Sequence, residues 1–247
     1  MAVPDANPST EHWPTGWHVR HVQETGSTNA DLVELARAGA VHHSVIVADH
    51  QTAGRGRLDR KWEAPPGANL LVSILFKPSL FRPLHHFTHI VGLAARNASN
   101  NLFGVRPDLK WPNDLLIGDR KVAGILAQGG TDFVVVGIGV NVGWAPDGAA
   151  RLGDQARGSN IELGPLDLLR EMLAEVERLE SLSNIELRAL YESQLATIGR
   201  RVRVELANGV IVEGTAIGID DEARLTVRLE SGETISVDVG DVIHLRA

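Results

Sequence analysis

The hydrophobic pattern of this chain changes character near Ile198 and Gly199, and this change constrains the fold more than any other feature. Before it, helical periodicity over 28–39, 84–103, 166–179 and 184–197 alternates with strand-like runs over 44–49, 68–77, 115–128 and 132–141. After it, short alternating segments are separated by turn dipeptides, Asn208-Gly209 and Ser231-Gly232. The pattern predicts an α+β (mixed α/β) fold, with a mixed sheet flanked by helices over 16–198 and a small C-terminal antiparallel β-barrel over 199–247. Residues 1–15 are predicted to be a flexible tail.

Composition excludes several classes of function. The chain has no cysteine, which excludes disulfides, cysteine metal sites and a thioester intermediate. Its net charge of −7 argues against a nucleic-acid partner. A polar N-terminus and the lack of a long apolar run predict a cytoplasmic protein with no membrane partner. The histidine pairs His42-His43 and His85-His86 have no cysteine or nearby carboxylate in sequence, so we expect structural roles and no zinc.

Residues 110–124 form the stretch most indicative of function. Gly118-Asp119 separates two short apolar runs, which predicts a hairpin. We expect this hairpin to bring Lys110, Asn113, Asp114 and Lys121 to one pocket. Two ammonium groups beside a carboxylate and an amide suit an anionic, metal-bound ligand such as a nucleoside triphosphate. The alternative is an ordinary hairpin with surface lysines.

A second segment, 51–62, is rich in glycine and positive charge. Over 54–61 it holds four cations and one anion, Asp59, in a chain that is acidic overall. Glycines allow close backbone approach, and arginine forks bind phosphates. The segment lacks the Gly-Lys-Ser/Thr ending of a P-loop. A solvated basic loop is the alternative, and a mobile loop that closes over a ligand is the functional interpretation.

Two further segments surround these. Ser27 or Thr28 is a good N-cap for the following helix, and such a helix end also binds polar or anionic ligand atoms. Residues 134–143 are a buried strand with the spacing GxGxxxG, and a turn-rich loop follows it rather than a helix. This excludes a dinucleotide fingerprint, so we expect no NAD. We expect a ligand to lie against the glycine backbone, beside Asn141.

In order and spacing these segments resemble the biotin–protein ligases. The matching residues are Gly-Ser-Thr-Asn at 26–29, Gln-Thr-Ala-Gly-Arg-Gly-Arg at 51–57, Lys-Trp-Pro-Asn-Asp at 110–114, Arg-Lys-Val-Ala-Gly-Ile-Leu at 120–126 and Gly-Ile-Gly-Val-Asn at 137–141. The resemblance covers roughly 17–245. The motifs begin by residue 25, so the chain resembles the monofunctional ligases, which lack an N-terminal DNA-binding domain. We therefore expect no operator binding.

The resemblance implies a two-step ligase reaction that uses ATP and Mg²⁺. Biotin and ATP form biotinyl-5′-AMP with release of pyrophosphate, and biotin then passes to a lysine of a biotin carboxyl carrier domain. The implied catalytic residues are Lys121, Lys110 and Arg57. The implied biotin-binding residues are Ser27, Thr28, Asn29, Gln51, Gly54, Arg55, Gly56 and Gly124. Arg57, Arg60, Trp62, Asn113, Lys121 and Asn141 would bind the nucleotide, with Trp62 stacked on adenine, and Asp114 would bind Mg²⁺.

The chain departs from the family pattern at Asp59, where the basic loop usually has a second-half glycine. We expect Asp59 to weaken retention of the adenylate. Two rival functions are a lipoate ligase of the same fold and a non-enzymatic biotin or nucleotide sensor. A sensor needs no lysine pair, and the basic-loop motif favours biotin over lipoate. The sequence allows a monomer or a weak homodimer.

Overall fold

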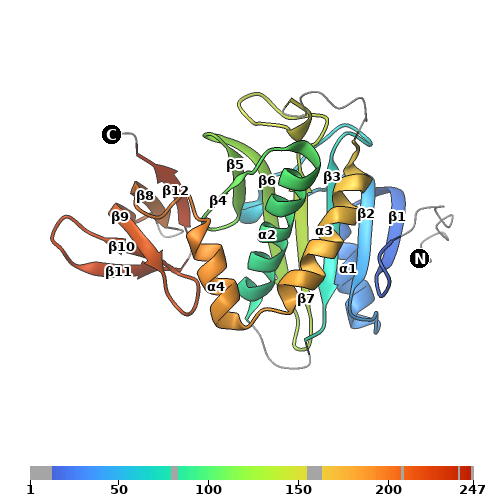
Figure 1. Ribbon diagram of the computed structural model, residues 1–247, viewed down its shortest axis with the longest axis horizontal. Coiled ribbons are helices and arrows are strands. Elements are labelled where there is room, and N and C mark those ends of the chain that lie inside the picture. Colours follow the sequence, from blue (N-terminus) through green and yellow to red (C-terminus); the bar gives the residue numbers. More distant parts are fainter. Residues whose placement is uncertain (1–12, 79–82, 155–162, 207–208, 239, 246–247) are drawn as a thin grey trace.

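The computed structural model describes residues 13–78, 83–154, 163–206, 209–238 and 240–245, which form two sheets and their covering helices (Figure 1). The larger sheet has seven strands in the order β1-β2-β3-β7-β6-β5-β4, and the smaller has five in the order β11-β10-β9-β8-β12. Only β1 and β2 pair in parallel. The strands of the larger sheet are β1 (His18–Thr25), β2 (Ser44–Gln51), β3 (Leu70–Phe76), β4 (Asp108–Lys110), β5 (Asp114–Ile117), β6 (Arg120–Gly129) and β7 (Val134–Val140). Those of the smaller are β8 (Arg201–Leu206), β9 (Ile211–Ile219), β10 (Leu225–Arg228), β11 (Thr234–Val237) and β12 (Gly240–His244).

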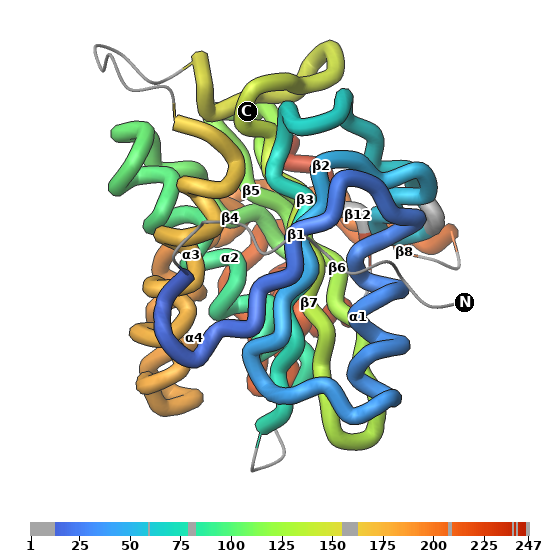
Figure 2. The backbone as a smooth tube through the Cα atoms, turned by 90° about the vertical axis from the view of Figure 1, so that its right-hand side faces the viewer, coloured from blue at the N-terminus to red at the C-terminus, as the bar shows by residue number. Residues whose placement is uncertain are grey.

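The helices cover the two faces of the larger sheet unequally (Figures 1 and 2). Helices α2 (Leu84–Phe103) and α3 (Pro165–Glu180) pack on one face, and α4 (Asn184–Ser193) packs against α2. Helix α1 (Thr28–Arg37) packs on the other face, against β2, β3 and β7. Two buried apolar clusters correspond to these faces: a large one under α2 and α3, and a small one that joins Leu32 and Ala36 of α1 to the sheet. Because α1 is short, it leaves part of this face of the larger sheet uncovered.

Local sequence explains where these elements begin and end. Helix α2 ends at Gly104, whose φ of 67° is a left-handed conformation that glycine adopts without strain. Helix α4 begins with a capping box in which Ser183 and Glu186 bond each other's backbone N–H. Gly118, with φ of 61°, forms the turn between β5 and β6. The hairpin that carries Lys121 is thus specified by its own turn.

The predicted fold class is confirmed, with two corrections. The sequence pattern missed the strands β1, β4 and β12, which lie at sheet edges and are partly exposed or short. The smaller sheet is antiparallel as predicted, but in the part of the chain that the structure describes its end strands β11 and β12 do not pair, so a closed barrel is not seen. Most of the predicted tail, 1–12, lies outside the described residues, and the division at 198–199 stays a prediction. No described helix is both long and apolar enough to span a membrane.

Candidate active site

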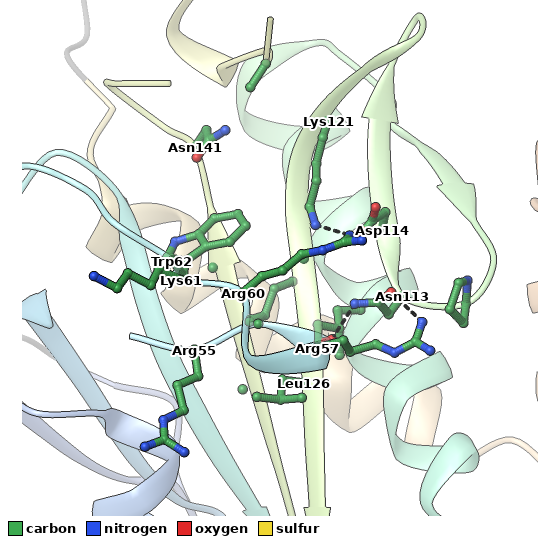
Figure 3. Close-up of a pocket in the computed structure, with 18 of the residues that line it drawn as sticks. Arg55, Arg57, Arg60, Lys61, Trp62, Asn113, Asp114, Lys121, Leu126 and Asn141 are labelled. Atoms are coloured by element: carbon green, nitrogen blue, oxygen red, sulfur yellow. Dashed lines mark hydrogen bonds and ion pairs between the residues drawn. The ribbon is translucent and has the colours of Figure 1, made fainter. Parts of the chain in front are cut away.

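A cavity of about 680 Å³ opens on the α1 side of the larger sheet, beyond the N-terminus of α1 (Figure 3). Every site residue predicted above lines it except Gly54. Gly54 instead serves the basic loop itself, because a Cβ there would lie 2.3 Å from the carbonyl oxygen of Trp62. The predicted cluster of lysines, arginines and polar residues therefore does converge on one space.

One end of the cavity is a buried polar network that joins α1, β2 and β3. Gln51 Oε1 accepts the backbone N–H of Thr28 at 2.8 Å. Thr28 Oγ1 lies 2.8 Å from Ser73 Oγ, and Ser73 O–H donates to Asn29 Oδ1 at 2.6 Å. Asn29 Nδ2 donates to the carbonyl of Leu126 at 3.0 Å. The N-cap residue Ser27 makes no side-chain cap bond.

The hydroxyl protons of this network have one consistent order. Asn29 Nδ2 is fixed on a carbonyl, so Asn29 Oδ1 faces Ser73 and receives the Ser73 proton. The Thr28 proton then goes to Ser73 Oγ at 2.8 Å rather than to Gln51 Oε1 at 3.1 Å. Ser73 is thus the shared link, and it was not predicted. Its only signal in the sequence is a single hydroxyl within the buried run 70–76.

Protein side chains, not open space, face two glycines of β7. A Cβ at Gly137 would lie 2.2 Å from Asn29 Oδ1, and one at Gly139 would lie 2.4 Å from Trp62 Cε2. Gly139 pairs across the sheet with Gly124 of β6, where a Cβ would lie 3.2 Å from Trp62 Cζ3. The indole of Trp62 therefore rests on this glycine pair. The expectation that a ligand lies against the glycine backbone stays a prediction, and it requires Trp62 to move from the Gly124–Gly139 pair.

Lys121 and Asp114 form an ion pair at the other end of the cavity. Lys121 Nζ lies 2.6 Å from Asp114 Oδ1 and 5.5 Å from the centre of the Trp62 ring. The two residues lie on neighbouring strands of the hairpin. Asp114 is on β5, opposite Gly124, and Lys121 is on β6. Figure 3 shows the ammonium directed into the cavity, beside Asp114. Attraction to a carboxylate and an indole face holds the flexible lysine in place.

Asn113 joins the hairpin to the basic loop. Its backbone carbonyl accepts from Ile125 N–H at 2.9 Å, and its Nδ2 donates to the Ile125 carbonyl at 2.8 Å. With Nδ2 fixed in this way, Asn113 Oδ1 accepts from Arg57 Nη1 at 3.2 Å. Asn113 thus positions an arginine of the loop over the cavity.

The basic loop is a small hairpin closed by an antiparallel bridge between Arg55 and Lys61. Trp62 N–H donates to the Gly54 carbonyl, and Gly56 N–H donates to the Arg60 carbonyl. In Figure 3 the Arg60 side chain reaches towards Asp114, whereas that of Arg55 points away from the Lys121–Asp114 pair. The structure does not describe the side chain of Asp59, so its effect on retention of the adenylate stays a prediction.

Asn141 lines the cavity and also forms a buried hydrogen-bonded pair of side-chain amides with Asn69. Its Oδ1 accepts from Asn69 Nδ2 at 3.3 Å, and its Nδ2 donates to the Ala150 carbonyl at 3.1 Å. Asn69 Oδ1 in turn accepts from the backbone N–H groups of Val142 and Trp144. Asn69 was not predicted. Together the two amides fix the loop that follows β7 above the cavity.

The smaller sheet also reaches the cavity, through Glu205 of β8 and Val242 and Ile243 of β12. Sequence patterns gave no sign of this, because the strand that carries two of these residues was not predicted. Lys110 and Trp111, at the end of β4, lie where the two sheets meet.

One cluster of possible metal ligands occurs among the described residues, away from the cavity. His42, His43 and Glu180 each offer an atom within 4.8 Å of the others. The two rings are stacked at 3.7 Å, and their Nε2 atoms both lie near the Glu180 carboxylate, at 3.7 Å for His42 and 2.7 Å for His43. Nδ1 of His42 accepts from Lys77 N–H, which places its proton on Nε2. The cluster is therefore a hydrogen-bonded tie to α3, in line with the expected structural role, although the carboxylate partner was not foreseen.

Two buried rings stack behind the hairpin. His89 of α2 lies on Tyr191 of α4 at 3.7 Å. Burial holds the pKa of His89 well below its usual 6.5, and the neighbouring His85, His86 and Arg188 lower the pKa further. Burial also raises the pKa of Tyr191, and the charge of Asp114 adds to this effect. Both rings are neutral at physiological pH.

A mixed sheet of this topology, with lysines, arginines and buried amides around one cavity, suits an enzyme that binds an anionic ligand. Residues 22–142 match the biotin/lipoate A/B protein ligase family, and 197–245 match the biotin protein ligase C-terminal domain. The biotin--[acetyl-CoA-carboxylase] ligase of Mycobacterium tuberculosis is 39% identical, over 94% of this chain and 91% of that protein. The bifunctional ligase/repressor BirA of Bacillus subtilis is 30% identical, over 88% of this chain and 71% of that protein.

Solved structures agree with these matches. The biotin protein ligase from Aquifex aeolicus in complex with biotin and ATP superposes with a TM-score of 0.76 at 26% identity, covering 93% of this chain and 99% of that one. The chain therefore belongs to the biotin protein ligase family, and it is a ligase.

Proposed function

We propose that this chain attaches biotin to a lysine of a biotin carboxyl carrier domain, using ATP, in two steps. The observation that carries the proposal is the meeting of three groups in one cavity: the Thr28–Ser73–Asn29 network, the Lys121–Asp114 pair and the arginine loop. Membership of the family and the likeness to a ligase bound to biotin and ATP support it. On this view residues 16–198 form the catalytic unit and 199–247 an accessory unit.

The polar end of the cavity suits the ureido ring of biotin. That ring presents one carbonyl and two N–H groups, so it needs donors and acceptors fixed side by side. Thr28 and Asn29 present both, and Ser73 holds them in a set orientation. Ser27, Gln51 and the loop backbone at Gly54, Arg55 and Gly56 complete this end. A lipoate ring offers no such polar groups, so the network favours biotin over lipoate.

The apolar part of biotin would lie along Trp62 and Leu126, with its carboxylate directed to Lys121. Trp62 Nε1 is buried and has no hydrogen-bond partner among the described residues, which leaves a donor for a ligand acceptor. In this structure Trp62 covers the Gly124–Gly139 pair. The earlier expectation that Trp62 stacks on adenine requires the loop to move, and it stays a prediction.

In the first step an oxygen of the biotin carboxylate attacks the α-phosphorus of ATP. A new P–O bond forms, the bond to the pyrophosphate oxygen breaks, and biotinyl-5′-AMP and pyrophosphate result. Lys121 would lie between the two anions and reduce their repulsion, while Arg57 and Arg60 would hold the phosphate. Positioning and charge neutralisation supply the catalysis, and no enzyme nucleophile is needed.

Mg²⁺ fits the residues present in a limited way. Asp114 Oδ1 pairs with Lys121 Nζ at 2.6 Å, and a carboxylate has further lone pairs that could accept a hard cation beside the lysine. Asp114 and the phosphates would hold the ion, which would neutralise phosphate charge. Lys110 would contact the outer phosphates, and Asn113 and Asn141 would support the nucleotide through Arg57 and the loop after β7.

In the second step the neutral ε-amine of the acceptor lysine attacks the carbonyl carbon of the mixed anhydride. An amide bond forms, the bond to AMP breaks, and the amine loses a proton. The loop arginines would keep the anhydride bound and shielded from water until the carrier arrives.

The test is intact-mass analysis of a biotin carboxyl carrier domain incubated with the protein, biotin, ATP and Mg²⁺. A single biotinyl addition that requires ATP is expected. Lys121→Ala should abolish pyrophosphate release while biotin still binds, and Lys77→Ala, outside the cavity lining, is the matched control. Unchanged turnover in Lys121→Ala would contradict the assigned role. A parallel reaction with lipoate and a lipoyl domain tests the alternative, which lipoate addition there without biotin addition would favour.

A further inference from the structure

The edge of the larger sheet next to Lys110 is covered by the chain that leads into the smaller sheet. Strand β4 is only three residues long and ends at Lys110. Leu109 N–H donates to the Gln194 carbonyl at 3.3 Å, and Ala196 N–H donates to the Leu109 carbonyl at 2.8 Å. A strand this short, at a sheet edge, has few bonds of its own to fix the residues that follow it.

Trp111, the residue after Lys110, is held at two points. Its backbone N–H donates to Thr197 Oγ1 at 3.1 Å, and its indole N–H donates to the Ala223 carbonyl at 2.9 Å. Ala223 belongs to the turn between β9 and β10. Trp111 and Thr197 are both buried. The smaller sheet and the chain that leads into it are therefore bonded directly to Trp111, the residue that follows Lys110.

His244 of β12 extends this contact into a chain of hydrogen bonds. Its Nδ1 lies 3.3 Å from Arg200 Nη1 and its Nε2 lies 3.2 Å from Thr197 Oγ1. A guanidinium only donates, so Nδ1 accepts, the proton lies on Nε2, and Nε2–H donates to Thr197. Burial lowers the pKa of His244 to about 4. The positive charges of Lys110 and Arg200 add to this effect, whereas the negative charge of Asp119 opposes it. The neutral ring thus keeps one tautomer at physiological pH.

We propose that Thr197 and His244 are positioning residues that set Lys110 for the nucleotide through Trp111. The smaller sheet then does more than line the cavity: it fixes one of the two lysines. This inference rests on the proposed function, in which Lys110 contacts ATP. The biotin end of the cavity, at α1, β2 and β3, shares no residue with this chain of bonds.

The test is the ATP dependence of pyrophosphate release by the full chain. Thr197→Val keeps the shape but leaves the buried Trp111 N–H and the half-buried His244 Nε2–H without their acceptor. We expect kcat/KM for ATP to fall about tenfold, since an unsatisfied buried donor displaces the backbone that bears it. The Kd for biotin, from isothermal titration calorimetry, should stay within about twofold. Thr197→Ser, which restores the hydroxyl, should restore the ATP dependence.

Matched variants separate positioning from folding. Thr88→Val removes a hydroxyl bond to the His85 carbonyl in α2, outside the cavity lining, and should leave both ligands unaffected. If Thr197→Val does not fold, Trp111→Phe removes the bond to Ala223 together with part of the buried ring, and Trp17→Phe, which loses a bond to Glu177 and the same ring volume, is its control.

Equal losses for ATP and biotin, or no loss in an active protein, would overturn the inference and leave the proposed function standing. Failure of the wild-type chain to release pyrophosphate with biotin and ATP would overturn both.

Discussion

Ser73→Ala is the substitution that most directly tests how the polar end of the cavity works. Ser73 is fully buried and bonds both Thr28 and Asn29, at 2.8 and 2.6 Å. After its removal the Thr28 hydroxyl can turn to Gln51 Oε1, which is 3.1 Å away, and so keeps an acceptor. Asn29 Oδ1 has no such substitute. An unsatisfied buried acceptor costs about 1–3 kcal/mol, so we expect the free energy of unfolding to fall by about 2 kcal/mol.

The effect on biotin should follow from the same reorientation. With the Thr28 proton on Gln51 and Asn29 no longer held by Ser73, two groups that face the ureido ring lose their set direction. We expect the Kd for biotin to rise about tenfold, which corresponds to about 1.4 kcal/mol. The KM for ATP should change by less than about twofold, because no residue of this network contacts the Lys121–Asp114 pair.

The assay combines titration calorimetry of biotin with urea denaturation. Ser99→Ala is the control, because Ser99 is equally buried and its hydroxyl donates to the Ala95 carbonyl within α2. That variant should lose stability only, with biotin affinity unchanged. If Ser73→Ala also lost stability alone, the network would be purely structural, and the reasoning about ligand orientation would be refuted.

Three further predictions follow from single features of the chain. Gly139→Ala should push Trp62 off the glycine pair, destabilise the fold by about 1–3 kcal/mol and shift the tryptophan emission to the red; an unshifted spectrum would show that the indole stays. Because folding lowers the pKa of His89 and His244 below 6.5, the unfolded chain binds more protons, so stability should fall as pH drops from about 6.5 towards 4. His244→Gln should flatten this slope in urea midpoints measured between these pH values, and an unaltered slope would exclude His244 as a contributor. Asp59→Gly should slow release of the adenylate in a filter-binding chase, and equal release rates would remove any role for Asp59.

Elements whose cause is local could be predicted from the sequence. The hairpin that bears Asp114 and Lys121 follows from Gly118 and its flanking apolar residues, and α2 ends at Gly104 as its pattern indicated. Strand β1 could not be found in this way. It lies at a sheet edge, pairs only with β2 and carries polar side chains, so no alternation marks it. Closure of the smaller sheet depends on whether its end strands β11 and β12 pair, and such a long-range pairing leaves no local pattern.

The residues that sequence reasoning missed are those whose partners are distant. Ser73 meets Asn29 from 44 positions away, and Asn69 meets Asn141 from 72. Glu180 reaches His43 across 137 positions. Ser73 interrupts an apolar strand, whereas Asn69 and Glu180 look ordinary in their own segments. The motifs predicted residues that line the cavity, whereas the buried residues that fix them became visible only in the fold.

The arrangement of the cavity also explains why the two ends should act independently. On the proposed function, the side chains that hold the ureido ring come from α1, β2 and β3, whereas most of those that hold the nucleotide come from β4 to β6 and the basic loop, whose backbone also borders the biotin end. Ser73 and Thr197 share no hydrogen-bond partner: Ser73 bonds Thr28 and Asn29, whereas Thr197 bonds Trp111 and His244. Effects of independent sites add within about 0.5 kcal/mol, so the double variant should show both losses in full. A shortfall would mean that the two ends are coupled, and the basic loop, which contacts both the glycine pair and Asn113, is the element that could couple them.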